Sequence, residues 1–159
     1  MENDRVFVTF SDDNGLTWDT DVNGRADEIT DDVKLTTWGW QATGPVHSIQ
    51  INHGEHAGRL VIPVDHIDDG PGGNGRWGSH LIYSDDHGET WTLGALFTDP
   101  DSGPNSGMIR PNETTIVELN DGRIFVNSRD HGSAPGNRSE TYSSNIGVSF
   151  DSDLSLIHI

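Results

Sequence analysis

Short runs of alternating apolar and polar residues, separated by turn residues, recur along most of the chain. Such runs predict β-strands, and nothing in the pattern alternates helices with them. The expected strands are residues 5–10, 45–52, 58–64, 79–84, 112–119, 122–129 and 145–150. Only residues 28–38 are expected to hold a helical turn, and residues 65–78 and 97–111 are Gly/Pro/Asp-rich loops. The pattern therefore predicts an all-β protein with antiparallel sheets.

One octapeptide occurs twice, as SDDNGLTW at residues 11–18 and as SDDHGETW at residues 84–91. In each copy the Asp can accept hydrogen bonds from its own turn, and the Gly can adopt positive φ. The Ser and Thr hydroxyls tie the arms, and the Trp packs under the turn as a core residue. The residues concerned are Ser11, Asp13, Gly15, Thr17, Trp18, Ser84, Asp86, Gly88, Thr90 and Trp91. We interpret the repeat as a structural hairpin, since the acid spacing and closing Glu of an EF-hand calcium loop are missing.

Composition narrows the function classes. The chain has 159 residues, a net charge of −17 and one lysine, Lys34. So acidic a surface repels nucleic acid, and no apolar run is long enough for a membrane span. The absence of cysteine excludes disulfides and thiolate metal ligands. We expect no cofactor and no metal, and the N-terminus does not resemble a signal peptide.

Three further segments accompany the octapeptides. The first is TGPVHSIQI followed by GRLVIP, the second is GSHLIYSDDHGETW, and the third is RPNETTIVELNDGRIFVNSRD. The octapeptide resembles the Asp box of sialidases, and the first segment is similar to their G-P-G-x-G-I-Q-L … G-R-L-V-x-P. The resemblance implies an antiparallel six-bladed β-propeller, of which residues 1–153 would form about two and a half blades as a partial domain.

The ends of the chain carry expectations of their own. A third box is expected to begin at Ser149 and Asp151, with its Gly and Trp replaced. We interpret residues 154–159, LSLIHI, as a non-native tail, because they resemble the translation of a sequencing adaptor. By the resemblance, an arginine and an aspartic general acid would precede this region, and a third arginine and a tyrosine nucleophile would follow it. For the full-length protein, a secreted, cell-surface or periplasmic location is expected.

The resemblance implies a function and a site. The protein would be an exo-α-sialidase that removes terminal sialic acid from a glycan with retention. Glu113 would be the general base for the tyrosine, Arg129 would clamp the substrate carboxylate, and Asp65 and Ile67 would contact substrate. Val46 and Ser48 stand where the family has glycines and are expected to narrow the pocket. The alternative function is a non-catalytic Asp-box propeller that binds glycan or protein.

The residues alone give Glu113 and Arg129 weaker support. A three-residue loop at Asn120–Gly122 would oppose Val117 to Phe125 and Glu113 to Arg129. A two-residue Asp-Gly turn would pair apolar with polar residues, so we prefer the first register. Alternation places Glu113 in line with Val117 and Leu119, which predicts a partly buried carboxylate. The structural alternative is a cross-strand ion pair worth about 0.2–1 kcal/mol.

Histidines and the asparagines of glycosylation sequons are the other residues that could form sites. His47, His53, His56 and His66 show no recurring metal-ligand spacing, so surface positions or supporting roles are expected for them. The sequons at Asn112 and Asn137 arise often by chance, and a glycan on Asn112 would block Glu113.

Overall fold

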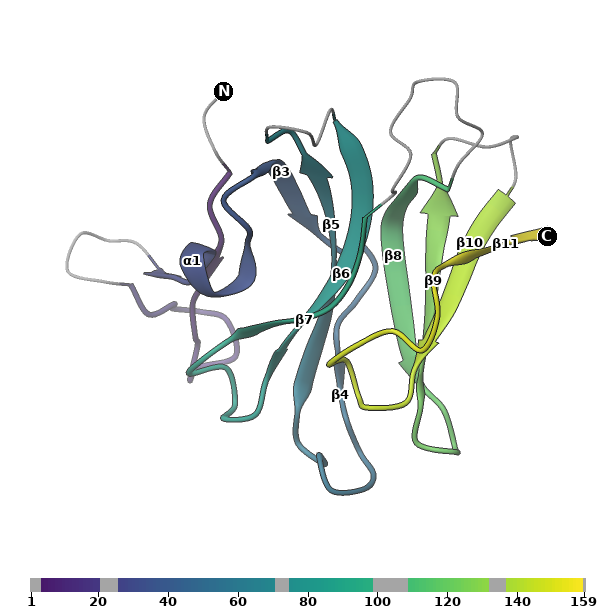
Figure 1. The fold of residues 1–159 in the computed structure, drawn as a ribbon. Helices are drawn as coiled ribbons and strands as arrows, with labels where there is room; N and C mark the ends of the chain where they lie inside the picture. The colour runs from purple at the N-terminus through teal and green to yellow at the C-terminus, as the bar shows by residue number, and fades with distance from the viewer. Residues whose placement is uncertain (1–3, 21–25, 71–74, 99–108, 132–136, 159) are drawn as a thin grey trace.

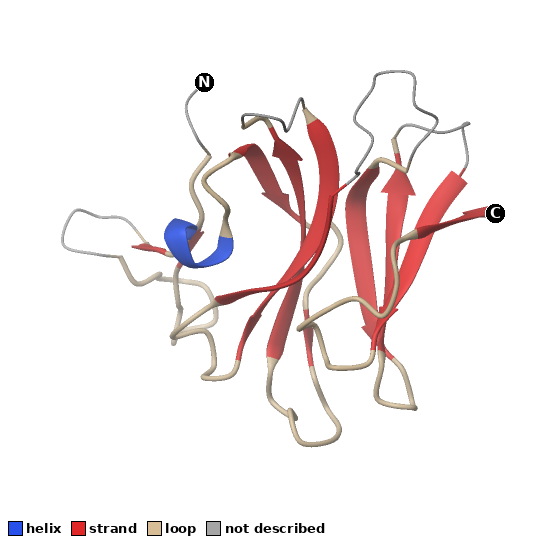
Figure 2. Cartoon of the chain, viewed as in Figure 1, coloured by secondary structure: helices blue, strands red, loops and turns tan. Residues whose placement is uncertain are grey.

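The computed structural model describes residues 4–20, 26–70, 75–98, 109–131 and 137–158. Within these residues, three antiparallel sheets stand side by side and one helical turn packs between the first two (Figure 1). Strands and loops make up nearly everything else (Figure 2). The chain is therefore all-β with antiparallel sheets, which confirms the fold class expected from the alternation.

The bounds of the elements follow from the hydrogen bonding. They are β1 (Phe7–Val8), β2 (Asp27–Glu28), α1 (Thr30–Val33), β3 (Trp38–Thr43), β4 (Ile49–Gln50), β5 (Leu60–Asp68), β6 (Arg76–Ser84), β7 (Thr92–Thr98), β8 (Pro111–Glu118), β9 (Ile124–Asp130), β10 (Asn137–Ser143) and β11 (Ser155–His158).

Apart from β4, chain order and spatial order agree within each sheet. The first sheet holds β1 and β2, the second runs β3-β5-β6-β7 with β4 beside β5, and the third runs β8-β9-β10-β11. Strands that are neighbours along this order pair antiparallel, so each sheet is a local meander. Successive meanders that pack face to face are the building plan of a β-propeller, in which each meander is one blade.

Two apolar clusters join the sheets. One lies between the first and second sheets and includes Val33, Val64 and Trp91. The other lies between the second and third sheets and includes Leu81, Ile116 and Val126. Because Ile116 and Val126 face the second sheet, the opposite face of β8 and β9 is the open one.

Polar links between sheets add to this packing. The buried guanidinium of Arg59 donates Nε and Nη2 to Asp85, and its Nη1 to the carbonyl of Ile146 in the turn between β10 and β11. Glu118 of β8 accepts the backbone N–H groups of Asn52 and His53 at 2.8 and 3.0 Å. Buried ionic groups that are fully hydrogen-bonded fix the relative position of the segments they join. These links therefore fix the position of the second sheet relative to the third.

Each octapeptide forms the expected turn. In the second copy, Ser84 Oγ donates to Asp86 at 2.8 Å and accepts from the N–H of Gly88 at 2.8 Å. The N–H and Oγ1 of Thr90 donate to Asp86 at 2.9 and 2.6 Å. The first copy has the same four bonds within 0.1 Å. Hydrogen bonds from Thr90 lower the pKa of Asp86 to about 2, which shows that the turn uses its charge.

A third turn of this kind exists, but not where the sequence was expected to place it. Ser143, Asn145, Gly147, Ser149 and Phe150 take the five positions of the box. Ser143 Oγ accepts from the N–H of Gly147 at 2.9 Å, and Asn145 Oδ1 accepts from the N–H of Ser149 at 2.9 Å. An amide oxygen thus replaces the carboxylate oxygen of the other boxes.

The expected third box beginning at Ser149 and Asp151 is therefore wrong. Asp151 lies after the turn and accepts hydrogen bonds from the N–H and Oγ of Ser144 at 2.9 and 2.7 Å. Asp151 thus joins the two ends of the turn between β10 and β11. The sequence comparison failed because Asn, Ser and Phe stand where the first two boxes have Asp, Thr and Trp.

The expectation that both box tryptophans are core residues is half wrong. Trp91 is 8% exposed and packs in the cluster between the first two sheets, but Trp18 is 58% exposed. Both rings lie beside the glycine of their own box, where a side chain on Gly15 or Gly88 would contact the ring. The local turn is therefore the same, and the difference is that Trp91 packs against the preceding sheet, whereas the described residues include no sheet before β1.

This difference predicts unequal costs of truncation. In the 159-residue chain, Trp91→Ala should lower the free energy of unfolding by about 3–5 kcal/mol, because it removes a large buried ring. Trp18→Ala, in the equivalent position, should cost less than about 1 kcal/mol. Urea denaturation of both variants gives the comparison. Equal losses would show that the two boxes do not differ in packing.

The expected tail takes part in the third sheet. Residues Ser155–His158 pair with Asn137–Glu140 as β11. Because this pairing uses backbone groups, it does not test the origin of the segment, and its non-native character stays a prediction. Of the helices in the described ranges, none has the length and apolarity to cross a membrane.

Candidate functional site

A pocket of about 450 Å³ lies between the second sheet and the first strand of the third. It includes Asp65 and Ile67 of β5 and Glu113 of β8, which are three of the four predicted site residues. The remaining lining residues are Trp40, Ala42, Thr43, Pro45, Asp69, Trp77 and Asn112. The pocket thus combines an apolar, aromatic surface with carboxylates, as sites for small polar ligands commonly do.

Arg129 joins this site through Glu113. Its Nη1 donates to Glu113 Oε2 at 3.0 Å, and each side chain is 47% exposed. The two residues lie on adjacent strands of one sheet and on the same side of it, as the sequence predicted. An ion pair so exposed contributes at most about 1 kcal/mol to stability. The pair therefore adds little to the stability of the fold.

The predicted register is correct only up to Glu113. Val117 is opposite Phe125 and Ile116 is opposite Val126, as expected, but Arg129 is opposite Asn112. Glu113 is the extra residue of a β-bulge and has φ of 44°, which is uncommon outside glycine. Bulges re-aim side chains next to binding sites. Here the bulge turns the Glu113 carboxylate toward both Arg129 and the pocket.

The expected partial burial of Glu113 is wrong. Val117, on the same side of β8, is 47% exposed, while Thr114 and Ile116 are buried. The alternation was identified correctly, but its apolar members were assigned to the wrong face. Thr114 and Ile116 face the second sheet, so the Glu113 side is the open side of the third sheet.

Asp65 has the most unusual electrostatic environment in the site. Its residue is 3% exposed, and its Oδ2 accepts the N–H of Glu113 at 2.6 Å while Oδ1 accepts Thr114 Oγ1 at 2.9 Å. Burial raises its pKa to about 6, although these two hydrogen bonds favour the charged form. Asp65 therefore contacts the backbone of Glu113 directly.

Two tryptophans that line the pocket, Trp40 and Trp77, were not predicted from the sequence. Trp40 and Trp77 lie with ring centroids 6.4 Å apart, and Trp77 stacks on His131 at 4.8 Å. Such faces can pack against the C–H surface of a sugar ring. The sequence pattern predicts a loop at residues 65–78 that contains Trp77, whereas β6 begins at Arg76. A predicted strand that began at Arg76 would have included Trp77.

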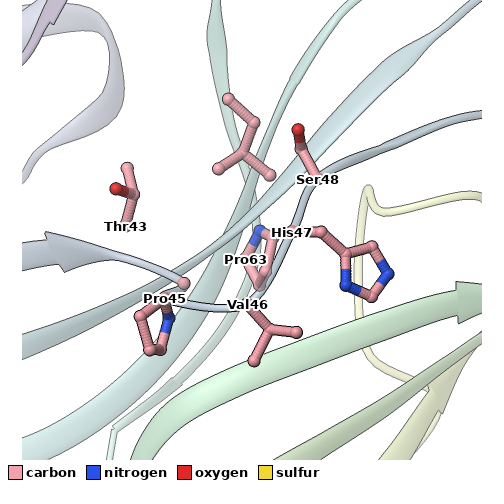
Figure 3. Close-up of a pocket in the computed structure, with 8 residues that line it drawn as sticks. Thr43, Pro45, Val46, His47, Ser48 and Pro63 are labelled. Atoms are coloured by element: carbon pink, nitrogen blue, oxygen red, sulfur yellow. The ribbon is translucent and has the colours of Figure 1, made fainter.

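Val46 and Ser48 surround a different pocket. This second cavity, of about 230 Å³, is lined by residues 43–48 with Ile62 and Pro63 (Figure 3). It shares only Thr43 and Pro45 with the candidate site. In Figure 3 the His47 ring points away from Thr43 and Pro45. The expected narrowing of the substrate pocket by Val46 and Ser48 therefore does not apply to the pocket that contains Glu113.

The histidines divide into two groups. His47, His53 and His56 belong to loops outside the strands, and His53 contacts Glu118. His66 differs from the expected surface position, since it is fully buried and its Nδ1 lies 3.0 Å from Nδ1 of the buried His80. Neither ring of this pair reaches the pocket lining.

Comparison with known proteins places this geometry in a family. Residues 1–157 match the BNR repeat-like domain. The chain is 35% identical over 125 residues to a sialidase of Micromonospora viridifaciens, and 32% identical over 155 residues to Sialidase-4 of Mus musculus. It belongs to the sialidase superfamily of BNR-repeat proteins.

Solved structures agree with this superfamily assignment. The leech intramolecular trans-sialidase matches with a TM-score of 0.68 at 28% identity, over 95% of this chain and 19% of that one. The Hadza microbial sialidase Hz136 matches with a TM-score of 0.69 at 24% identity, over 92% of this chain and 24% of that one, which supports the fold. The sheets are accordingly blades of a sialidase-type β-propeller.

This member of the superfamily spans a minor part of its relatives. The matched segment covers 77% of the chain and 16% of the Micromonospora viridifaciens sialidase, and 92% of the chain and 28% of the mouse protein. Activity and substrates of the whole protein are therefore matters for proposal.

Proposed function

We propose that this chain is part of the catalytic propeller of an exo-α-sialidase, which hydrolyses terminal sialic acid from glycans with retention. The observation that carries the proposal is the Glu113–Arg129 pair at the mouth of an apolar pocket. A general base and a guanidinium that lie side by side fit a substrate that has one carbon open to nucleophilic attack and one carboxylate. The sialidases among its relatives support the same reaction class.

The chemistry explains why Glu113 would act as a base rather than a nucleophile. The anomeric carbon of a sialoside bears a carboxylate, which would repel an attacking carboxylate. A neutral tyrosine that loses its proton to Glu113 during attack avoids this repulsion. Tyr83 and Tyr142 stack under Arg59 and Arg123 instead, and neither lines the pocket. These are the two tyrosines of the sequence, so the proposed nucleophile lies outside these 159 residues.

Arg129 would hold the substrate carboxylate. A planar guanidinium pairs bidentately with carboxylates, and the contact with Glu113 uses only one of its five donors. The same contact keeps the guanidinium close to the base. Binding would thus place the anomeric carbon near Glu113 without a metal or cofactor in the scheme.

Removing this clamp tests the proposal through binding. In the full-length protein that carries this chain, Arg129→Ala should weaken binding of a carboxylate-bearing sialic acid analogue about 10- to 100-fold, since charge-assisted hydrogen bonds are lost. Arg129→Lys should recover only part of the affinity, because the ammonium cannot bind bidentately.

Calorimetric titration measures both variants, with Arg123→Ala as the matched control on the same strand pair. Arg123 pairs with Asp121 at the far end of the β8–β9 hairpin, so its loss should leave affinity unchanged. Unaltered affinity in Arg129→Ala would remove Arg129 from the site. Retained glycan binding without any turnover in the wild type would favour a binding propeller.

A further inference from the structure

The backbone of Glu113 is held in a conformation that needs external support. Its φ of 44° lies in the left-handed region, which is unfavourable in free energy for a residue that has a side chain. As the extra residue of a bulge, it has no partner on β9 in the strand register. Its N–H points instead to the carboxylate of Asp65 at 2.6 Å. A single side chain of the neighbouring sheet therefore satisfies the strained residue.

A buried hydroxyl network extends from the same carboxylate. Thr114 Oγ1 lies 2.9 Å from Asp65 Oδ1 and 2.8 Å from both Ser79 Oγ and Ser128 Oγ. An ionised carboxylate can only accept, so Thr114 donates its one proton to Asp65 and receives from both serines. All three hydroxyl residues are fully buried. Asp65 thereby sets the direction of a network that reaches Ser128, the residue before Arg129.

We propose that Asp65 is a positioning residue of the reaction: its ionised carboxylate holds the Glu113 bulge and, through Thr114 and Ser128, the strand that carries Arg129. The role rests on the proposed function, because it acts through the base and the clamp of that reaction. Asp65 lines the same pocket but is buried behind Glu113, with both of its oxygens hydrogen-bonded to β8. Misplacement of a catalytic group by about 1 Å can cost about 100-fold in rate.

The groups around Asp65 make its ionisation matter near neutral pH. Burial, together with the smaller effect of the charge of Glu113, raises its pKa to about 6. Asp69 also lines the pocket, and His131 stacks on Trp77 at its edge. The strand neighbours Ala42 and Ser79 carry no charge. Below about pH 6 Asp65 gains a proton and can donate, so the arrangement around Glu113 is expected to loosen.

The test is Asp65→Asn in the full-length protein, with an aryl α-sialoside as substrate. We expect kcat to fall about 10- to 100-fold with KM changed less than about threefold, and the acid limb of the kcat profile to move to lower pH. The melting temperature of Asp65→Asn at pH 8 should equal or exceed that of the wild type, because the variant removes a buried charge that is unfavourable above pH 6. Asp68→Asn on the same strand is the control, since among the described residues its carboxylate accepts a hydrogen bond from the N–H of Gly70 in its own turn.

A second pair of variants keeps the test decisive if Asp65→Asn does not fold. Thr114→Val removes the hydroxyl bound to Asp65 and should lower kcat, whereas Thr114→Ser keeps it and should not. An active wild type with unchanged kcat and unchanged pH profile in Asp65→Asn would overturn the positioning role alone. A folded wild type with no sialosidase activity would overturn the proposed function, and the positioning role with it.

Discussion

Glu113→Gln in the full-length protein is expected to lower kcat for an aryl α-sialoside by about two to three orders of magnitude, which is the usual size of a general-base contribution. The amide keeps the shape of the side chain and can still accept a hydrogen bond from Arg129, now 3.0 Å away in the ion pair. It cannot take a proton from an attacking tyrosine. Ligand binding should therefore change much less than turnover.

Glu89→Gln provides the matched control. Glu89 is an exposed carboxylate in the second box, at the opposite end of β6 from Trp77, so its replacement should leave kcat intact. Steady-state kinetics with both variants, together with inhibitor affinity, separates the outcomes. Near-normal turnover in Glu113→Gln would remove Glu113 from the role of base.

Acid is expected to destabilise the fold through the buried pair His66 and His80. Burial lowers the pKa of His66 to about 3, and burial together with the charge of His66 lowers the pKa of His80 well below its usual value. The Nδ1 atoms lie 3.0 Å apart and share one proton, and Trp38 stacks on His66 at 3.8 Å. If the pair bound a second proton, both Nδ1 atoms would carry hydrogen and the two N–H groups would repel each other.

The sign of the effect follows from proton binding. Below about pH 6.5 the unfolded chain binds protons at both histidines while the folded chain does not, so stability is lost as pH falls. From pH 7 to pH 5 the loss should be about 4 kcal/mol for the pair. Asp65 acts in the opposite direction, because its raised pKa makes the folded state bind a proton more readily.

Urea denaturation of the 159-residue chain at pH 7 and pH 5 measures this loss. The double variant His66→Leu/His80→Leu should lose most of the pH dependence, whereas His47→Gln, at an exposed loop position, should keep it. If the double variant and the wild type show the same dependence on pH, the buried pair is not the acid-sensitive element.

The parts of the fold that local sequence determines were predictable. The boxes need only Asp, Gly, Ser and Thr at fixed offsets, and the hairpin at 120–122 follows from matching apolar residues across it. The third box was missed because Asn145 stands in place of Asp. Asn145 accepts the same backbone N–H bond as Asp86 but donates to the following hydroxyl, whereas Asp86 accepts from it. Trp18 was misjudged because its burial depends on which sheet packs against it.

The site was predictable as a set of residues but not as a geometry. Glu113, Asp65 and Ile67 do share a pocket, and Arg129 does pair with Glu113. The bulge was not foreseen, because it depends on a contact between Glu113 and Asp65, which are 48 residues apart in sequence. Alternation alone also cannot say which face of β8 packs on the neighbouring sheet.

Release of free sialic acid from an aryl α-sialoside by the full-length protein tests the central claim most directly. The account predicts turnover by the wild type, its near-complete loss in Glu113→Gln, and no turnover of the same aryl glycoside without the carboxylate. A folded wild type that binds the sialoside and releases no sialic acid would contradict it, and the chain would then be part of a glycan-binding propeller.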